Sequence, residues 1–559
     1  MTVPETFSLD ENPDWPTQGA YEYADYYSSQ KEVVSFDDFI KTRHAKESYD
    51  HVIIGAGPIG AALAYKLAQD RPDGQLLLIE KSWTEPDRIV GELMQPAGCQ
   101  AMELLGLSNV FSGIGAVPVH GYHISYSGKH LFVPYMERPN GHGRFRGNSF
   151  HHGRLVMNLR AACKAQANIT CLEASAVELI GETTKDGRLE TVRGVRLGPS
   201  RTKDECENSN GPVARPRGLT FVCDGIMSQF RKHLHGSPVE PISHFCGFVL
   251  EHEPHEPVAT STYFDGPTGA TDHLARIEEK GVRENPLPMP HNGNVLLDGV
   301  GPVLLYQMSE CETRVLADIP GSLLPSEAGG HLRRVLRQSL EAAASKSQFP
   351  GLQAQLTQAL DDSRRIRCIG SRFIPATGKS AHGAVWLGDA LNIRHPLTGG
   401  GMTVGLWDVV ILTDLLASTP SIAALSEDPS TLRRIKAQWH WRRRPRALVV
   451  NVLSVALHAL FAADSRELGL LREACFDYLS RGSRFTMEPS GFLSGLLPSP
   501  ILLLFHFFSV AFLAIRLRIS GRSTAYTGGS LLVRIYTAFY TLYVAASVIL
   551  PVMWTELQP

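Results

Sequence analysis

The residues whose types and spacing point most directly to chemistry are Gly388-Asp389 and the three consecutive glycines Gly399–Gly401. An apolar strand is predicted at Ala384–Leu387, just before the Gly-Asp pair, and a helix is predicted to start at Thr403. A backbone that carries no side chains can approach a flat ligand closely and present its amides to it. We therefore expect this segment to lie against a planar ligand.

A second glycine pattern lies much earlier in the chain. The predicted strand Tyr49–Ile54 runs into Gly55–Gly60, a GxGxxG turn, and a helix is predicted to follow at Ala61–Asp70. A further strand, predicted at Gln75–Ile79, ends at Glu80. This order of strand, glycine turn, helix, strand and acidic residue is the fingerprint of a dinucleotide-binding βαβ unit.

Each residue of the fingerprint has a physical task. Gly55 permits the tight turn, Gly57 lets a pyrophosphate approach the backbone, and Gly60 allows helix and strand to pack closely. The helix N-terminus stabilises the anion, and Glu80 accepts hydrogen bonds from ribose hydroxyls. Together with the later triple glycine, the fingerprint predicts one large cofactor with two ends.

Composition narrows the class of protein. The chain has 559 residues, enough for two or three domains, and its 54 basic residues nearly balance its 56 acidic ones. This balance argues against a general nucleic-acid-binding protein. The nine cysteines include no CxxC pair, so the sequence predicts neither a disulfide framework nor a metal site. We expect a reduced, cytosol-facing protein without a signal peptide at Met1–Phe7.

Several segments lie outside the dinucleotide unit. Residues 1–48 are acidic and aromatic, and we expect a partly disordered N-terminal extension that docks, if at all, through aromatic side chains. Those side chains are Trp15, Tyr21, Tyr23, Tyr26 and Tyr27. Two polar segments, Arg201–Arg217 and Gly281–Asn294, are expected to be weakly structured insertions.

Strand-like apolar runs predict a second sheet. The runs His244–Leu250, Val303–Met308 and Thr313–Asp318 are typical of antiparallel strands, and the last two would form a hairpin. Helices are predicted at Gly330–Ala343 and Gly351–Leu360. We assign these strands to a substrate domain.

The composition changes again from about Asp428. A basic, aromatic helix at Arg433–Arg446 precedes three apolar segments, at Ala447–Ala463, Ile501–Ile515 and Ile535–Met553. The middle segment is short for a membrane span, which needs about 20 residues. We expect helices that pack on the body and insert into one leaflet, with a C-terminal span as the alternative. The basic helix is expected to contact anionic lipid head groups, or else to be a solvated face.

Three separated motifs agree on a protein class. They are the fingerprint, the DGxxSxxR pattern in Phe221–Arg231, and the Gly-Asp to triple-glycine stretch. Together they resemble flavoprotein monooxygenases of the para-hydroxybenzoate hydroxylase type. The longer motifs Glu85–Pro96, Phe150–Arg154 and Arg394–Met402 resemble the squalene monooxygenase (squalene epoxidase) family more specifically. That resemblance covers residues from the first predicted strand, at Tyr49, into the apolar C-terminal part.

The resemblance implies a set of site residues. Asp389 would bind the flavin ribityl chain, and Leu93 stands where animal members have Phe. Gln95 and Tyr122 would face the reaction centre as the catalytic pair. The residues implied to bind FAD are Gly55, Gly57, Pro58, Ile59, Gly60, Glu80, Lys81, Arg88, Leu93, Arg154, Val177, Asp389, Gly400 and Met402. The residues implied to line the substrate pocket near the membrane are Phe461, Leu497, Pro498, His506 and Phe507.

The resemblance also implies an activity. It predicts FAD-dependent epoxidation of squalene to (S)-2,3-epoxysqualene with dioxygen, through a flavin C4a-hydroperoxide, in sterol (ergosterol) biosynthesis. No second strand–glycine–helix unit for NADPH is evident, so a microsomal NADPH-cytochrome reductase would supply the electrons. The expected location is the endoplasmic reticulum membrane with the catalytic domain facing the cytosol, and lipid droplets are a second candidate. The alternatives are a flavoenzyme acting on another polyprenyl lipid, or a non-catalytic flavin-binding membrane protein.

The expected fold class is α/β. A Rossmann-like, three-layer FAD-binding domain would be combined with a mixed-sheet substrate domain and a C-terminal helical membrane-associated region. The FAD-binding domain would comprise residues 49–120, 150–240 and 371–427, and the substrate domain residues 121–149 and 241–370. The extension, 1–48, and the C-terminal region, 428–559, complete the chain.

Overall fold

The fold is described from a computed structural model of the chain. The structure describes residues 31–42, 48–141, 143–185, 189–199, 211–234, 239–253, 287–349, 351–378, 381–419, 422, 425, 428–526 and 528–558. The aromatic residues proposed to dock the extension, Trp15 to Tyr27, lie outside these ranges, as do residues 201–210 and 281–286 of the two predicted insertions.

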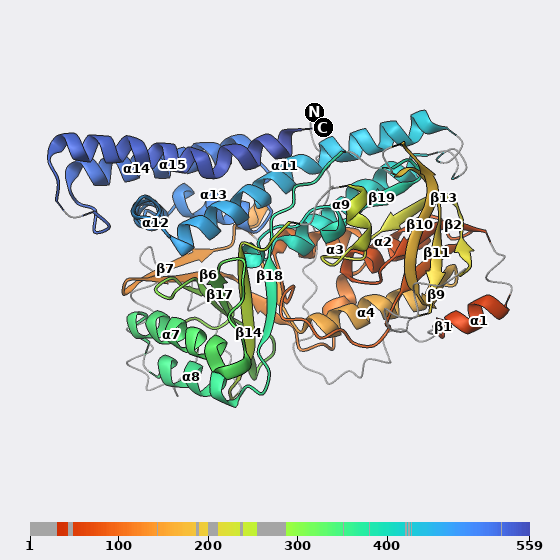
Figure 1. The fold of residues 1–559 in the computed structure, drawn as a ribbon, viewed down its shortest axis with the longest axis horizontal. Helices are drawn as coiled ribbons and strands as arrows, with labels where there is room; N and C mark the ends of the chain where they lie inside the picture. The colour runs from red at the N-terminus through yellow and green to blue at the C-terminus, as the bar shows by residue number, and fades with distance from the viewer. Residues whose placement is uncertain are drawn as a thin grey trace.

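A six-stranded parallel sheet forms the first half of the body, at the right of Figure 1. Its central strands are buried on both faces because helices cover them, as parallel sheets require. In sheet order they are β1 (Val34–Ser35), β9 (Ile169–Glu173), β3 (Leu76–Glu80), β2 (Tyr49–Ile54), β13 (Pro216–Val222) and β19 (Ala384–Trp386). Its helices are α2 (Pro58–Asp70), α3 (Pro96–Leu104), α4 (His152–Lys164) and α9 (Gly401–Ala417).

Part of the N-terminal extension joins this sheet. β1 pairs in parallel with β9, with Val34 opposite Leu172. The helix α1 (Phe36–Lys41) follows, capped by Ser35, and buries Phe39. The docking of residues 34–41 therefore uses an edge strand and Phe39.

A seven-stranded sheet forms the second half, at the lower left of Figure 1. In order its strands are β18 (Arg367–Ser371), β14 (Ser243–Glu251), β17 (Glu312–Pro320), β16 (Val303–Gln307), β15 (Gly293–Leu296), β6 (Gly121–Tyr126) and β7 (Lys129–Pro134). The predicted hairpin is confirmed, because β16 and β17 pair antiparallel. β15 lies parallel to β6, so the sheet is mixed. The helices α7 (His331–Lys346) and α8 (Leu352–Asp362) complete its core cluster.

The second predicted insertion is more ordered than expected in its last part. Residues 287–294 are almost entirely buried, and Gly293 begins strand β15. Asn294, fully buried, donates hydrogen bonds to the carbonyls of Met289 and Asn292. The polar composition of this segment suggested a solvated loop, but its asparagines satisfy backbone groups inside the protein.

Two small sheets complete the strands. One contains β4 (Leu93–Met94), β8 (Gly147–Ser149) and β5 (Val117–Val119), and lies beside the Gln-Pro motif. The other contains β10 (Ser175–Thr183), β11 (Leu189–Gly198) and β12 (Val213–Ala214).

Five helices form the C-terminal region. They are α11 (Pro429–Ala462), α12 (Arg466–Leu479), α13 (Arg484–Leu493), α14 (Pro500–Ser520) and α15 (Leu531–Leu557). The predicted basic helix and the first apolar segment are one 34-residue helix, α11. The middle apolar segment belongs to a 21-residue helix, longer than predicted. In the part of the chain that the structure describes, three helices, α11, α14 and α15, are long and apolar enough to cross a membrane.

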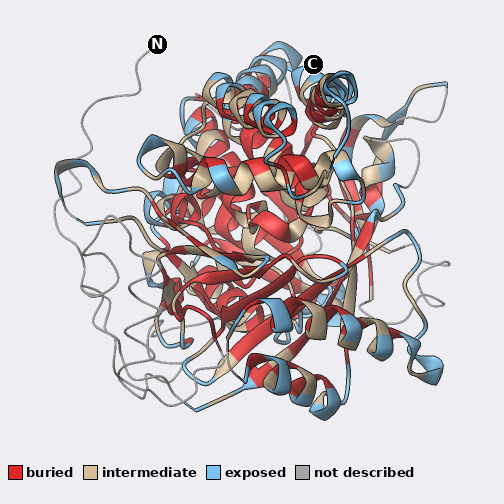
Figure 2. Ribbon diagram, turned by 90° about the vertical axis from the view of Figure 1, so that its left-hand side faces the viewer, coloured by how far each residue is buried: buried red, intermediate tan, exposed pale blue. Residues whose placement is uncertain are grey.

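Helices α14 and α15 lie side by side along one long edge of the molecule (Figure 1). Only 28% of the most apolar window in each is buried, so large apolar side chains face outward. Figure 2 shows exposed helical surfaces around a buried centre. The outward residues include Ile501, Phe505, Phe512, Tyr536, Phe539, Tyr540, Tyr543 and Trp554. This surface makes the C-terminal helices a membrane-associated region. The two sheets and their helices confirm the predicted α/β fold class.

Candidate functional site

The glycine fingerprint forms a tight turn between β2 and α2. Gly55 has a φ of +98°, and a Cβ there would lie 2.6 Å from the Cys223 carbonyl oxygen. A Cβ on Gly60 would lie 1.9 Å from the Gly55 carbonyl oxygen, whereas one on Gly57 would meet no atom within 4 Å. Gly55 and Gly60 therefore allow the backbone to pack, and Gly57 leaves open space at the N-terminus of α2.

Glu80, at the end of β3, supports this turn. Its Oε2 accepts a hydrogen bond of 2.8 Å from the backbone N–H of Ala56 and lies 3.6 Å from Arg160 Nη2. The guanidinium of Arg160 also donates to the carbonyl oxygens of Ala56 (3.0 Å) and Thr84 (3.0 Å). The carboxylate and guanidinium thus fix the loop before any ligand binds.

The Gly-Asp and DGxxSxxR motifs meet on the neighbouring strands. Arg231 donates from Nη2 to the carbonyl oxygens of Asp389 (2.8 Å) and Gly225 (2.9 Å). Burial raises the pKa of the Asp224 carboxyl to about 6, and burial also raises the pKa of Asp389. Asp224 Oδ1 has no hydrogen-bond partner within the described protein. A ligand with hydroxyl or N–H donors would satisfy such a buried acceptor.

Gln95 and Tyr122 come from separate elements and meet directly. Gln95 Nε2 donates to the Tyr122 hydroxyl oxygen and to the Thr398 carbonyl oxygen (2.9 Å). Its Oε1 accepts from the Tyr135 hydroxyl at 2.9 Å, and the Tyr122 and Tyr135 rings pack edge to face. Burial raises the pKa of Tyr122 to about 12. The phenol is therefore neutral and oriented by the amide, which in turn holds the loop before the triple glycine.

One cavity of about 430 Å³ joins these motifs. Its first wall, the glycine wall, consists of Gly55, Gly57, Gly388, Gly399 and Gly401. A second part of its lining, the sheet wall, consists of Tyr122, Val295, Leu304, Tyr306, Leu316 and Ile369 of the seven-stranded sheet. The predicted residues that line the cavity are Gly55, Gly57, Pro58, Ile59, Glu80, Lys81, Arg88, Leu93, Gln95, Tyr122, Asp389 and Met402.

Four of the residues implied to bind the cofactor do not line this cavity. Gly60 packs under the turn, and a Cβ on Gly400 would lie 2.4 Å from Val450 Cγ1 of α11. Gly400 is therefore required by helix packing. Arg154 donates to the Ile114 carbonyl oxygen (3.4 Å), and Val177 lies half-buried in β10.

On the same helix as Arg154, Arg160 lines the cavity, and the role of Arg154 in binding the cofactor stays a prediction. Both lie on α4, and a separation of six residues turns a helix by about 240°, so they face different directions. The motif His151–Arg154 drew attention to the first arginine. Gly153 packs against the Pro86 carbonyl, and Arg160 lies two helical turns after it, on the same face of α4. This spacing was the signal that could have identified Arg160.

The predicted substrate residues do not gather at the large cavity. Phe461 packs on the apolar cluster that includes the sheet-wall residues Val295 and Leu316. His506 is buried and hydrogen-bonded to the Tyr478 hydroxyl (2.8 Å) and to Glu488. Leu497 packs with α11, and Pro498 is half-buried. That these residues line a substrate pocket near the membrane stays a prediction.

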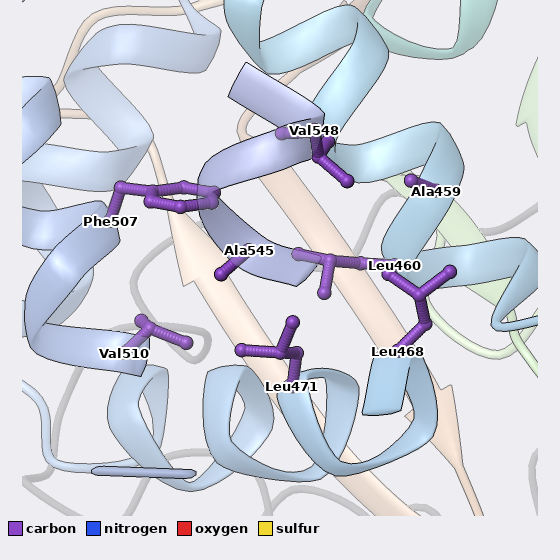
Figure 3. Close-up of a pocket in the computed structure, with 9 residues that line it drawn as sticks. Ala459, Leu460, Leu468, Leu471, Phe507, Val510, Ala545 and Val548 are labelled. Carbon is purple, nitrogen blue, oxygen red and sulfur yellow. The ribbon is translucent and has the colours of Figure 1, made fainter. Parts of the chain in front are cut away.

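Phe507 lines a much smaller apolar space among the C-terminal helices. Figure 3 shows its ring with Val510 of α14, Ala545 and Val548 of α15, and side chains of α11 and α12. The free space there is about 10 Å³, no more than one water molecule needs. It is a packing gap between helices.

The described residues contain one group of possible metal ligands. Asp318, His395 and His458 offer atoms within 4.8 Å of one another. His395 Nδ1 accepts a hydrogen bond from the Leu397 backbone N–H, so its neutral ring carries the proton on Nε2, which faces Ser243 Oγ at 3.0 Å. That nitrogen therefore cannot ligate a metal in this arrangement.

The fold is shared with solved flavoproteins. HpxO of Klebsiella pneumoniae, solved with FAD, is 16% identical, with a TM-score of 0.54 over 81% of this chain and 99% of that one. PqsL of Pseudomonas aeruginosa, described as a probable FAD-dependent monooxygenase, is 20% identical, with a TM-score of 0.52 over 75% and 96%. The fold is that of the FAD-dependent monooxygenases.

Sequence comparison identifies the family within this class. The squalene epoxidase family model matches residues 217–261 and 280–532. The squalene epoxidases of Candida albicans and Aspergillus fumigatus are 34% and 37% identical, over 91% and 93% of this chain and 99% and 96% of their own. The squalene monooxygenase of Mus musculus is 33% identical over 91% of this chain and 78% of its own. The chain belongs to the squalene epoxidase family.

Proposed function

We propose that this protein is an FAD-dependent monooxygenase that epoxidises squalene to (S)-2,3-epoxysqualene with dioxygen. The observation that carries the proposal is one cavity that the glycines of the dinucleotide-binding motifs and the apolar residues of the seven-stranded sheet line together. A polar, backbone-lined side suits an anionic cofactor, and an apolar side suits a hydrocarbon. Family membership favours squalene over another polyprenyl lipid.

The residues present fit FAD. Gly57 opens the N-terminus of α2 to a pyrophosphate, because nothing occupies the space beside its Cα. The cavity-lining residues Asp224, Arg372 and Thr398 each keep one buried polar atom without a partner in the described protein. Glu80 and Lys81 would hold the adenosine half, and Asp389 and Met402 the other end, with Arg88 and Leu93 between them. When bound, FAD supplies the activation of dioxygen.

The remaining residues position substrate and exclude water. The Gln95 amide donates hydrogen bonds to both the Tyr122 hydroxyl and the Thr398 carbonyl. It therefore joins the sheet wall to the loop before the triple glycine. Leu304, Leu316 and Ile369 give one terminal alkene an apolar surface. A dry surface of this kind favours a single bound orientation and keeps water from the reacting atoms. No side chain is required as nucleophile or general base.

Electrons and substrate would arrive from outside. The parallel sheet contains a single glycine fingerprint in the described residues, so we assign reduction to a microsomal NADPH-cytochrome reductase. The outward apolar faces of α14 and α15 would lie in the endoplasmic reticulum membrane, from which squalene can enter without crossing water. Lipid droplets would be a second location.

Aerobic incubation with squalene, FAD and NADPH, with and without the reductase, tests the proposal. Epoxide is expected only with the reductase. The Tyr122→Ala protein is expected to keep FAD and lose epoxidation, and Tyr126→Ala, on the same strand but outside the cavity lining, serves as the matched control. A wild-type protein that binds FAD but forms no epoxide with the reductase would refute the activity.

A further inference from the structure

The last turn of α15 carries a buried acid. Glu556 is only 2% exposed, although most of α15 turns apolar side chains outward. Its Oε1 accepts a hydrogen bond of 2.8 Å from Asn451 Nδ2 of α11. A carboxylate is costly to bury, so its retention at the end of an apolar helix calls for a role. The positive charges of Arg443, Arg394 and Arg444 attract the Glu556 carboxylate.

Asn451 links Glu556 to Arg394, which lines the cavity. It is fully buried, and its Oδ1 accepts a hydrogen bond of 2.8 Å from Arg394 Nε. Its Nδ2 also donates to Asn392 Oδ1 at 3.1 Å. One amide thus connects the end of the C-terminal helix with the loop that follows the Gly-Asp pair, and all of its polar atoms are used.

Arg394 completes the connection at the glycine wall. Its Nη1 donates to the carbonyl oxygens of Gly400 (3.3 Å) and Gly401 (3.2 Å), and its side chain lines the cavity. Consecutive glycines lose more conformational freedom on ordering than other residues do. Such a segment keeps one conformation only when contacts from outside hold it. Arg394 supplies these contacts, and Asn451 and Glu556 hold Arg394.

The main chain of α15 is held at the same place. Arg444 Nη1 donates to the Leu557 carbonyl oxygen at 2.9 Å, next to Glu556 in the chain. The neighbouring Arg443 is tied to Asp408 of α9 by two hydrogen bonds of 2.8 Å. The end of α15 is therefore docked on α11, and α11 on the helix that starts at the triple glycine.

We propose that Glu556 is a positioning residue, which acts through Asn451 and Arg394 to hold the triple-glycine loop in its cofactor-binding conformation. The affinity for FAD then depends on the docking of a helix whose other face meets lipid. The inference rests on the proposed function for the identity of the cofactor. The role of Glu556 in holding the loop does not rest on the proposed function, because the loop can be observed without FAD.

The test uses the full-length protein in detergent. The Glu556→Ala protein is expected to bind FAD at least tenfold more weakly, measured by flavin fluorescence titration. Amide hydrogen exchange of residues 392–402 in the FAD-free protein is expected to rise in this variant. Glu556→Gln keeps an acceptor for Asn451 and should restore most of the affinity. Thr555→Val, in the same turn, is the matched control and should match the wild type.

Three outcomes would overturn the inference. The first is wild-type FAD affinity in Glu556→Ala. The second is unchanged exchange at 392–402. The third is increased exchange throughout the chain, which would make Glu556 a general stabilising residue. If Glu556→Ala fails to fold, Asn451→Ala interrupts the same route and is judged by the same measurements. A wild-type protein that binds no FAD would refute the proposed function, whereas the exchange measurement would still decide the role of Glu556.

Discussion

The glycine wall and the sheet wall face the same cavity but are built in different ways. The glycine wall is backbone, and its shape depends on the absence of side chains at Gly55, Gly57 and the later glycines. The sheet wall is made of side chains from four strands, β6, β15, β16 and β17, and from β18 at the sheet edge. A backbone site is encoded by consecutive residues, whereas a side-chain site requires strand pairing between distant segments.

The contact between the segment before β4 and the seven-stranded sheet gives the largest expected effect. Glu92, which precedes β4, is 1% exposed and receives two hydrogen bonds of 2.8 Å from Arg314 of β17. The Tyr306 hydroxyl adds a third at 3.1 Å. The Arg314→Met change would leave the carboxylate buried without its cation, which costs about 3–5 kcal/mol.

Urea unfolding of the purified variant measures this cost. The matched control is Arg193→Met, whose ion pair with Glu182 has both side chains at least 60% exposed. We expect the control to change the free energy of unfolding by less than about 1 kcal/mol. Equal losses in the two variants would mean that the buried pair of Glu92 and Arg314 does not hold this segment to the seven-stranded sheet.

Two glycines of the fingerprint, one in the glycine wall and one packed beneath the turn, should behave differently. A Cβ at Gly60 would meet the Gly55 carbonyl oxygen at 1.9 Å, so Gly60→Ala is expected to cost about 3 kcal/mol of stability, by overpacking. A Cβ at Gly57 enters open cavity space, so Gly57→Ala should keep the thermal midpoint and weaken FAD binding. Thermal unfolding and flavin fluorescence, measured on both proteins, separate the effects. A stable Gly60→Ala protein would disprove the packing role.

This difference between the walls explains what the sequence could predict. The fingerprint at Gly55–Gly60, with Glu80, predicted a local unit whose parts are close in the chain, and the structure contains it. The meeting of Gln95 with Tyr122 was implied by family motifs. The sheet wall was not predicted, because Tyr122 reaches Gly293 only through a parallel pairing of β6 with β15. No local pattern specifies such a pairing.

The helical residues show the same limit. Arg154 lies in a recognisable motif, yet Arg160 faces the cavity, since the direction of a side chain on α4 is fixed by how the helix packs. The pocket residues predicted on the C-terminal helices were apolar and aromatic, but apolar helices also pack against each other. Phe507 does so around the small gap in Figure 3.

The sheet wall can be tested separately. Leu316 is 4% exposed and lines the cavity, so Leu316→Ala should enlarge the apolar side at a cost of about 2 kcal/mol. We expect a higher KM for squalene and an unchanged Kd for FAD. Leu336→Ala, in α7 behind the same sheet, is the control that destabilises without touching the cavity. A weaker FAD affinity in Leu316→Ala alone would show that the two walls do not act separately.

Acid compares the two sheets through two buried histidines. Burial lowers the pKa of His51, in the six-stranded sheet, to about 4, and that of His123, in the seven-stranded sheet, to about 3. The unfolded chain binds these protons near pH 6.5, so between pH 6.5 and 4 it holds more protons than the folded protein. Stability therefore falls as the pH falls, by about 1.4 kcal/mol per pH unit for each histidine. The stability that acid removes is fully present above pH 6.5.

The two histidines differ in where this loss ends. For His51 it should end near pH 4, and for His123 it should continue to about pH 3. The free energy of unfolding of the FAD-free protein, measured at each pH, should fall less steeply below pH 6.5 in His51→Asn than in the parent. Between pH 4 and 3 only the His123→Asn change should still reduce the slope, because by then the His51 ring is protonated in both states. Identical slopes in the parent and both variants would show that neither ring is kept neutral by the fold.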